Sequence, residues 1–140
     1  MKQQIINFAS LRVLVVDDVA LARRLLFTML RQMGIENVTV VTNGTDALRQ
    51  LDNKPFDILL CDWNMPGMSG LEVLVKVREQ PRLNRLPVLM VTAEISSAQV
   101  KDAMLAGVTS YVAKPFTPAI LRDHITDCLT ESGCRDASCV

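Results

Sequence analysis

The sequence predicts an α/β fold in which five helices cover both faces of a doubly wound, five-stranded parallel sheet. Two observations indicate this fold. First, short apolar runs recur along the chain at 12–16, 38–41, 58–61, 88–91 and 110–112. Each run is too continuous to be buried on one side only, as is typical of strands in parallel sheets. Second, longer stretches with apolar residues at helical spacing separate the runs, which favours right-handed crossover helices between parallel strands.

The first helix is expected between the runs 12–16 and 38–41. Its apolar stripe consists of Leu21, Leu25, Met29 and Met33. Gly34 closes this helix, because glycine tolerates the left-handed conformation that ends many helices. Asn43 and Gly44 then form a turn before the second helix.

The later helices are marked by the residues that begin them. These residues are Ser69 with Glu72, Ser96 with Gln99, and Thr117 with Pro118. The first two pairs have the spacing of a capping box, and the third places proline at the first helical position. Leu121, Ile125 and Leu129 give the last helix its apolar stripe.

The length and composition predict one domain. A chain of 140 residues with 49% hydrophobic content can bury a core of its own. We divide it into an N-terminal extension at 1–10, a domain at 11–130 and a flexible C-terminal tail at 131–140. The tail is assigned because apolar periodicity ends near Thr130.

The charge and hydropathy patterns exclude several classes of protein. Fifteen basic residues balance fifteen acidic ones, so no basic field attracts nucleic acid. No segment approaches the roughly 20 apolar residues of a membrane span, and the first ten residues lack the apolar stretch of a signal peptide. We therefore expect a cytoplasmic protein that binds neither nucleic acid nor membrane. Separately, we expect a monomer.

The cysteines are Cys61, Cys128, Cys134 and Cys139. A chain with its own core and no secretion signal does not need a disulfide framework. A sharper alternative is a zinc site formed by His124 with the last three cysteines, although structural zinc usually has a more closely spaced pair. The plainer interpretation is a small core cysteine and exposed thiols on the tail.

Polar residues with chemical potential follow the predicted strands. They are Asp17, Asp18, Asp62, Thr92 and Lys114. Ligands bind at the carboxyl ends of the strands in open parallel sheets, and a cation is needed to offset three neighbouring carboxylates. Mg²⁺ suits such oxygen ligands. We assign Asp18 and Asp62 as direct ligands, Asp17 as a ligand through water, and the backbone carbonyl of Asn64 as a further oxygen.

Asp62 has a second predicted role as the nucleophile that accepts a phosphoryl group and becomes an aspartyl phosphate. Mg²⁺ and the Lys114 ammonium neutralise the phosphoryl oxygens, and the Thr92 hydroxyl donates to one of them. Taken singly, three of the residues have plainer interpretations. Asp18 could cap the first helix, Thr92 could cap a strand end, and Lys114 could be a solvated cation.

Four segments resemble the receiver domain of two-component response regulators. They are 15–18, 62–70, 89–94 and 111–116. The resemblance covers about residues 10 to 130 and is greatest to the single-domain chemotaxis regulators. It implies a flavodoxin-like fold with strand order 2-1-3-4-5. It also implies a histidine kinase as phosphoryl donor, Mg²⁺ as cofactor, and Asp62 as acceptor.

The resemblance further implies individual roles. Thr92 is the switch hydroxyl, Tyr111 the rotating aromatic, and Lys114 the phosphate-binding residue, joined to Pro115 by a cis peptide bond. Asn64 and Glu94 bracket the attacking water and tune a short phosphate lifetime. The implied partner face consists of Ile95, Ser97, Val100, Met104, Tyr111, Phe116 and His124.

The implied function is that of a stand-alone response regulator with at most self-phosphorylation and self-dephosphorylation activity. Its phosphorylation-dependent target is a flagellar switch protein, and a phosphatase is a further partner. The chain departs from the chemotaxis type at Ser97 and His124, which replace basic residues, and at Val19 and Ala20, which replace Phe-Ser. The alternative is therefore a receiver that acts as a phosphate sink, a relay intermediate or a regulator of a non-flagellar partner.

Two other classes of protein also use a strand-end carboxylate or this architecture. Haloacid-dehalogenase-type phosphatases need a second aspartate two residues after the nucleophile, where this chain has Asn64. A flavin-binding module needs a phosphate loop after the first strand. Asp17 and Asp18 would instead repel a phosphate that lacks a cation.

Overall fold

The structure, a computed structural model, describes residues 6–93 and 95–133. Its centre is a five-stranded parallel sheet with the order β2-β1-β3-β4-β5. The strands are β1 (Arg12–Val16), β2 (Asn37–Val41), β3 (Ile58–Cys61), β4 (Val88–Thr92) and β5 (Ser110–Ala113). The predicted fold class and strand order are confirmed.

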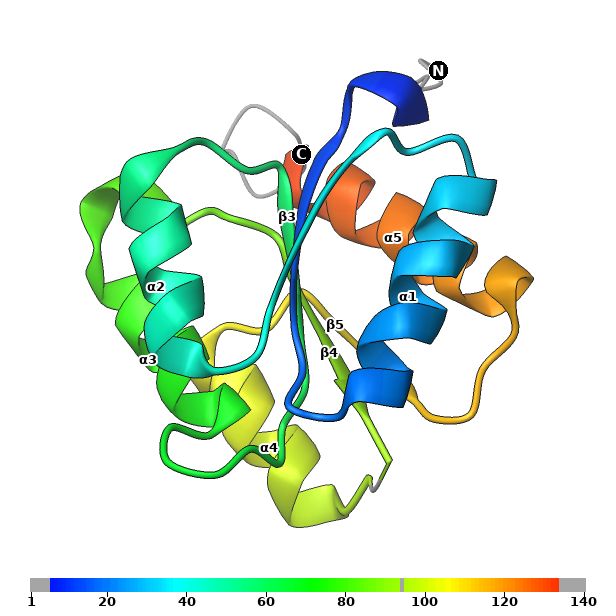
Figure 1. Cartoon of the computed structure of the whole chain (residues 1–140). Coiled ribbons are helices and arrows are strands. Elements are labelled where there is room, and N and C mark those ends of the chain that lie inside the picture. The colour runs from blue at the N-terminus through cyan, green and yellow to red at the C-terminus, as the bar shows by residue number, and fades with distance from the viewer. Residues whose placement is uncertain (1–5, 94, 134–140) are drawn as a thin grey trace.

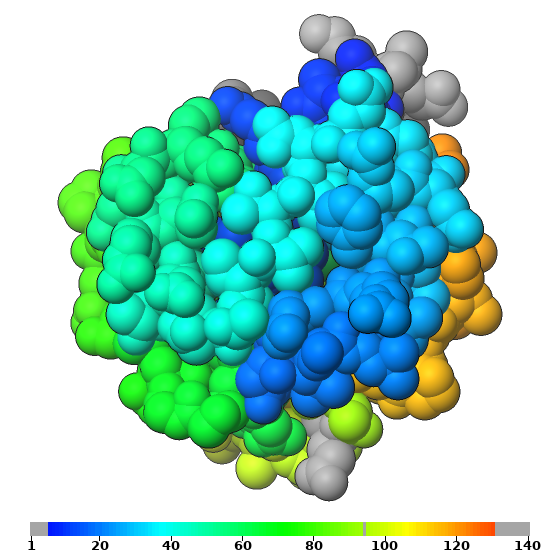
Figure 2. Space-filling view, in the orientation of Figure 1, coloured from blue at the N-terminus to red at the C-terminus, as the bar shows by residue number. Residues whose placement is uncertain are grey.

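Five helices cover the sheet on both faces (Figure 1). They are α1 (Ala20–Gln32), α2 (Gly44–Asn53), α3 (Gly70–Glu79), α4 (Ser97–Ala106) and α5 (Pro118–Gly133). Two short 3₁₀ turns, η1 (Phe8–Ser10) and η2 (Pro81–Leu83), complete the elements. Helices α1 and α5 lie on one face and α2, α3 and α4 on the other. In Figure 2, side chains of α1, β2 and α2 cover the sheet edge that faces the viewer.

Alternation along the strands builds two cores. Val13 and Val15 of β1 pack into the cluster under α1 and α5, while Leu14 and Val16 pack into the cluster under α2, α3 and α4. All four side chains are buried. Both faces of the sheet are therefore apolar, which leaves the strand ends as the places where polar chemistry can gather.

Three of the expected helix ends are confirmed. Gly34 follows α1 with a φ of 95° in the left-handed region. Ser69 and Glu72 form a complete capping box at the start of α3. The Thr117 hydroxyl accepts a hydrogen bond from the Ile120 backbone N–H at 3.1 Å, so it caps α5.

Two local expectations are wrong. Asn43 caps α2 by accepting from the Asp46 N–H at 2.8 Å, so Asn43 and Gly44 begin the helix and do not form a separate turn. At the start of α4, the Ser96 hydroxyl accepts from the Gln99 N–H at 3.1 Å, but no reciprocal bond closes a capping box. The Gln99 side chain instead bonds with Tyr111 on β5.

Helix α5 runs to Gly133, so residues 131–133, which we assigned to the tail, are helical. The remainder of that segment, with Cys134 and Cys139, lies outside the described residues. Among the helices of the described residues, none has both the length and the apolar character needed to span a membrane.

Candidate functional site

The polar residues singled out in the sequence gather at the carboxyl edge of the sheet. Asp17 follows β1, Asp62 follows β3, Thr92 ends β4 and Lys114 follows β5. Backbone bonds fix this edge, because the Asp62 N–H donates to Val16 at 3.0 Å and the Lys114 N–H donates to the Thr92 carbonyl at 2.7 Å. The side chains of Asp17, Asp62 and Thr92 are buried there.

Three carboxylates converge at this edge. Asp17, Asp18 and Asp62 each offer an oxygen within 4.8 Å of the others, and this is the only such group of potential metal ligands among the described residues. Asp18 does not cap α1, since Val19 holds that position without a side-chain bond. The plainer interpretation of Asp18 is therefore wrong.

Asp17 is already engaged within the protein. One carboxylate oxygen accepts from the Val19 backbone N–H at 2.9 Å, and the other accepts from the Lys114 ammonium at 2.8 Å. Arg23 of α1 donates to the Asp17 backbone carbonyl at 2.9 Å. These bonds orient Asp17, and they leave Asp18 and Asp62 as the carboxylates with fewer protein partners.

Lys114 lies inside the site. Its ammonium forms an ion pair with the buried Asp17, and only 22% of its side chain is exposed. The peptide bond between Lys114 and Pro115 is cis. The interpretation of Lys114 as a solvated loop cation is therefore wrong.

The ionised form of the Asp62 carboxyl is disfavoured in this site. Burial raises its pKa from 3.8 to about 6, and the negative charges of Asp17 and Asp18 contribute to the rise, whereas Lys114 opposes it. Burial and like charges both disfavour the ionised form. A cation or a cationic partner at this position would restore a fully ionised carboxylate.

Gly70 is a structural requirement that the sequence reasoning did not single out. It begins α3, and its N–H donates to the Trp63 carbonyl at 2.8 Å. A β-carbon at this position would overlap the backbone of Asp62 and Trp63. The start of α3 can therefore lie against the acceptor residue only because position 70 is glycine.

An aromatic pair adjoins the site. The ring centroids of Trp63 and Tyr111 lie 6.2 Å apart with the planes tilted by 49°. The Tyr111 hydroxyl donates to the Gln99 side-chain carbonyl of α4 at 3.1 Å. Burial, with a contribution from the Asp62 charge, raises the pKa of Tyr111. Gln99 is a second residue that sequence reasoning missed, because its spacing indicated a cap.

The seven residues of the expected partner face do not share one environment. Ile95, Ser97 and Met104 are exposed, while Val100 and Tyr111 are half-buried. His124 of α5 shares a hydrogen bond with the Ser110 hydroxyl at 2.9 Å. Phe116 instead lines a small apolar cavity with Leu25 and Met29 of α1, which places it on the α1 side of the sheet.

The remaining expected residues are placed as follows. Asn64 is exposed in the loop after Asp62, and Glu94 lies outside the described residues. Cys128, one of the four zinc candidates, is buried in the core under α1 and α5.

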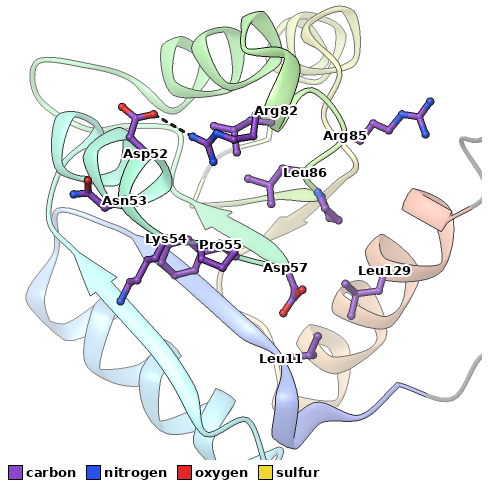
Figure 3. Close-up of a pocket in the computed structure, with 13 residues that line it drawn as sticks. Leu11, Asp52, Asn53, Lys54, Pro55, Asp57, Arg82, Arg85, Leu86 and Leu129 are labelled. Atoms are coloured by element: carbon purple, nitrogen blue, oxygen red, sulfur yellow. Dashed lines mark hydrogen bonds and ion pairs between the residues drawn. The ribbon is translucent and has the colours of Figure 1, made fainter.

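A large cavity lies at the opposite end of the sheet (Figure 3). It has a volume of about 800 Å³ and is lined by residues that precede the strands, including Leu11, Asp57 and Pro87. Arg82 and Asp52 pair with each other at its edge at 3.3 Å. This cavity contains none of the convergent carboxylates, so we assign the functional site to the carboxyl edge.

A parallel sheet of this order, with an acidic cluster, a hydroxyl and a lysine at its carboxyl edge, is the arrangement that the sequence predicts for a receiver domain. The family model described as "Response regulator receiver domain" matches residues 13–126. The chain belongs to this family.

Individual relatives sharpen the assignment. The chain is 46% identical over 115 residues to the chemotaxis protein CheY of Pseudomonas aeruginosa, covering 82% of this chain and 93% of that protein. The crystal structure of chemotaxis protein CheY4 of Vibrio cholerae superposes with a TM-score of 0.81 at 32% identity, covering 85% and 98% of the two chains. The receiver domain of sensor histidine kinase PA1611 of P. aeruginosa, with a magnesium ion in its active site cleft, has a TM-score of 0.79 at 28% identity, covering 86% and 98%.

The acidic cluster fits a magnesium ion. Mg²⁺ takes oxygen ligands at about 2.0–2.1 Å, so oxygens a few ångströms apart can share one ion after small side-chain adjustments. The three carboxylate oxygens meet that condition. The raised pKa of Asp62 indicates that its ionised form is disfavoured, and a bound Mg²⁺ would favour that form.

Proposed function

We propose that Asp62 accepts a phosphoryl group from the phosphohistidine of a histidine kinase and that the chain then changes its binding to a protein target. The observation that supports this proposal best is the position of Asp62. Its side chain is buried close to two further carboxylates, and the positive charge of Lys114 lowers its pKa. Asp18, Asp62 and the Asn64 carbonyl are the proposed direct ligands of Mg²⁺. Asp17 acts through water, held by its bonds to Val19 and Lys114.

The transfer is a displacement at phosphorus. An oxygen of Asp62 forms a bond to phosphorus, the bond from phosphorus to the histidine nitrogen breaks, and the imidazole leaves with the electron pair. Bound Mg²⁺ supplies positive charge to the phosphoryl oxygens. Lys114 supplies a second positive charge, and the Thr92 hydroxyl, buried at the end of β4, donates to one of the same oxygens.

The phosphate is lost by attack of water on phosphorus, which restores the Asp62 carboxylate and releases inorganic phosphate. Asn64 and Glu94, which follow Asp62 and Thr92 by two positions in the sequence, are proposed to keep the lifetime short. This activity acts on the chain's own phosphate. We therefore propose a signalling protein that catalyses at most its own phosphorylation and dephosphorylation. A phosphate stable for many hours in Mg²⁺ would contradict this assignment.

Chemotaxis is the proposed output, with a flagellar switch protein as the target. Identity of 46% to a chemotaxis protein over most of the chain supports it. The exposed apolar side chains of Ile95 and Met104 offer contact area for such a target. A phosphatase is a further proposed partner. The alternative output is that of a phosphate sink, a relay intermediate or a regulator of a non-flagellar partner, and it rests only on Ser97 and His124 in place of the basic residues of the chemotaxis type.

Trp63 offers a direct test of the site, since it is the only tryptophan and adjoins Asp62. Adding Mg²⁺ and then the phosphate mimic beryllofluoride should change its fluorescence in two steps. Asp62→Asn should abolish the second step. A second step that survives in this variant would show that Asp62 is not the acceptor.

The output needs a separate experiment. The flagellar switch protein should be retained on immobilised protein with beryllofluoride and not without it. Retention in neither state would reject the flagellar target and leave a phosphate sink, a relay intermediate or a regulator of a non-flagellar partner as the output.

A further inference from the structure

Gln99 occupies a position that no role in the site explains. It lies in the first turn of α4, and its own N–H is satisfied by the Ser96 hydroxyl. Its side-chain carbonyl does not take part in capping α4 and accepts a hydrogen bond from the Tyr111 hydroxyl at 3.1 Å. The bond joins residues twelve positions apart and crosses from α4 to β5.

Tyr111 is in turn connected to the acceptor. Its ring packs with the core under α2, α3 and α4, and it lies against Trp63, which directly follows Asp62. Its backbone belongs to β5, three residues before Lys114. A change at Asp62 can therefore reach Tyr111 through direct packing, and Tyr111 can reach α4 through one hydrogen bond.

We propose that Gln99 is a positioning residue that holds Tyr111 in the orientation seen here, so that the Tyr111 ring and the first turn of α4 change together when Asp62 is phosphorylated. This inference rests on the proposed phosphorylation of Asp62 and adds the residue that couples it to the α4 surface. As part of this proposal, we assign the bond between Gln99 and Tyr111 to the unphosphorylated protein. Its loss therefore favours any other orientation of Tyr111 at the expense of this one.

The direction of the effect follows from linkage. If phosphorylation favours a Tyr111 orientation without the Gln99 bond, removing the bond tightens binding of a phosphate mimic by the free energy of that bond. A neutral hydrogen bond contributes about 1 kcal/mol, which corresponds to about fivefold in affinity.

Gln99→Met tests the bond with little change in volume. Methionine removes the acceptor, keeps the length of the side chain and is a good helix former. Beryllofluoride in Mg²⁺, followed by Trp63 fluorescence, should bind about fivefold more tightly to this variant. Gln99→Glu is the control that retains an acceptor, and because a carboxylate accepts a stronger hydrogen bond than an amide, its affinity should be equal to or lower than that of the original protein.

Tyr111→Phe removes the donor and completes a double-mutant cycle. It should tighten beryllofluoride binding by a similar factor, and Gln99→Met should add nothing when combined with Tyr111→Phe. Ring NMR signals of isotopically labelled Tyr111 should shift in Gln99→Met without beryllofluoride, which a purely structural cap would not cause. Equal affinities of Gln99→Met and the original protein, or additive effects in the cycle, would overturn the inference.

The controls separate this inference from the proposed function. If the original protein binds beryllofluoride and Asp62→Asn does not, the acceptor is correct, and the Gln99 variants alone decide the coupling. If the original protein does not bind beryllofluoride, the proposed function fails and the coupling fails with it. The Tyr111 ring signals would still show whether Gln99 orients that side chain.

Discussion

At the scale of the residue, Asp62 combines a chemical role with a cost in stability. Its pKa rises from 3.8 to about 6 on folding, mainly because the side chain is buried and because Asp17 is close. Between these values the folded chain binds more protons than the unfolded chain, so stability falls as the pH rises through this window. Above about pH 6 the full cost of the ionised carboxylate is present.

Asp62→Asn should therefore stabilise the metal-free protein at about pH 8, by about 1–2 kcal/mol, because solvent screens part of the charge repulsion at this site. The gain should disappear below about pH 4, where the folded and the unfolded chains both carry a protonated carboxyl at this position. Thermal unfolding in a chelator, followed by circular dichroism at both pH values, measures the difference. Adding Mg²⁺ should raise the melting temperature of the original protein and leave the variant nearly unchanged. Equal melting temperatures at the higher pH would contradict this account of Asp62.

At the scale of the element, the start of α3 is shaped to approach the acceptor. Gly70 and Gly44 each begin a helix, α3 and α2 respectively. A β-carbon at position 70 would meet the backbone of Asp62 and Trp63, whereas at position 44 it would meet side-chain atoms of Val73 and Met68. Side chains can adjust more easily than backbone, so the two glycines are not equivalent.

Gly70→Ala should lower the free energy of unfolding by about 1–3 kcal/mol and reduce the rate of phosphorylation of Asp62. Gly44→Ala is the matched control and should cost less, because its β-carbon would meet only the side chains of Val73 and Met68 and no backbone. Urea unfolding and phosphorylation by a small phosphodonor measure both properties. A larger stability loss for Gly44→Ala would contradict the role assigned to Gly70.

At the other edge of the sheet, the beginnings of β1 and β3 are held together by bonds between Arg12 and Asp57. Asp57 accepts from the Arg12 backbone N–H at 2.8 Å and pairs with its guanidinium, while the Asp57 N–H donates to the Arg12 carbonyl at 2.8 Å. The Arg12 bonds hold the pKa of Asp57 below its usual value of 3.8. Because the folded pKa is lowered, this contribution is present above the unfolded pKa and is lost as the pH falls through the folded one.

Asp57→Asn should thus cost about 1 kcal/mol near neutral pH and progressively less as the medium becomes more acidic than about pH 4. It should leave phosphorylation of Asp62 intact, because Asp57 lies at the far end of the sheet. Urea unfolding at several pH values measures the first effect. A cost that does not diminish in acid would show that the charge of Asp57 is not involved.

The elements also show what the sequence can predict. The strands and their order follow from apolar runs and helical spacing, together with the family resemblance, because burial on both faces leaves a strong pattern. Residue spacing alone does not determine which side chains cap a helix. Gln99 had the position for a capping box, but its side chain is taken by Tyr111, a residue on another element. Such competition depends on tertiary contacts that local sequence does not contain.

At the scale of the whole molecule, the site is assembled from the ends of four strands. The sequence could identify Asp17, Asp62 and Lys114 because parallel strands bring their carboxyl ends to one edge. It could not identify the close approach of Gly70 or the engagement of both Asp17 oxygens, since these depend on how α3 and β5 are seated. The placement of Phe116 beside α1 likewise follows from packing and not from its position in a motif.

The central claim is that Asp62 receives a phosphoryl group, and intact-protein mass spectrometry tests it most directly. Incubation with phosphoramidate and Mg²⁺ should add a single phosphoryl group to the original protein and to Asp57→Asn. Hydroxylamine should remove it, as expected for an acyl phosphate. Asp62→Asn should gain none. A hydroxylamine-sensitive phosphoryl group on Asp62→Asn, or none on the original protein, would contradict the account.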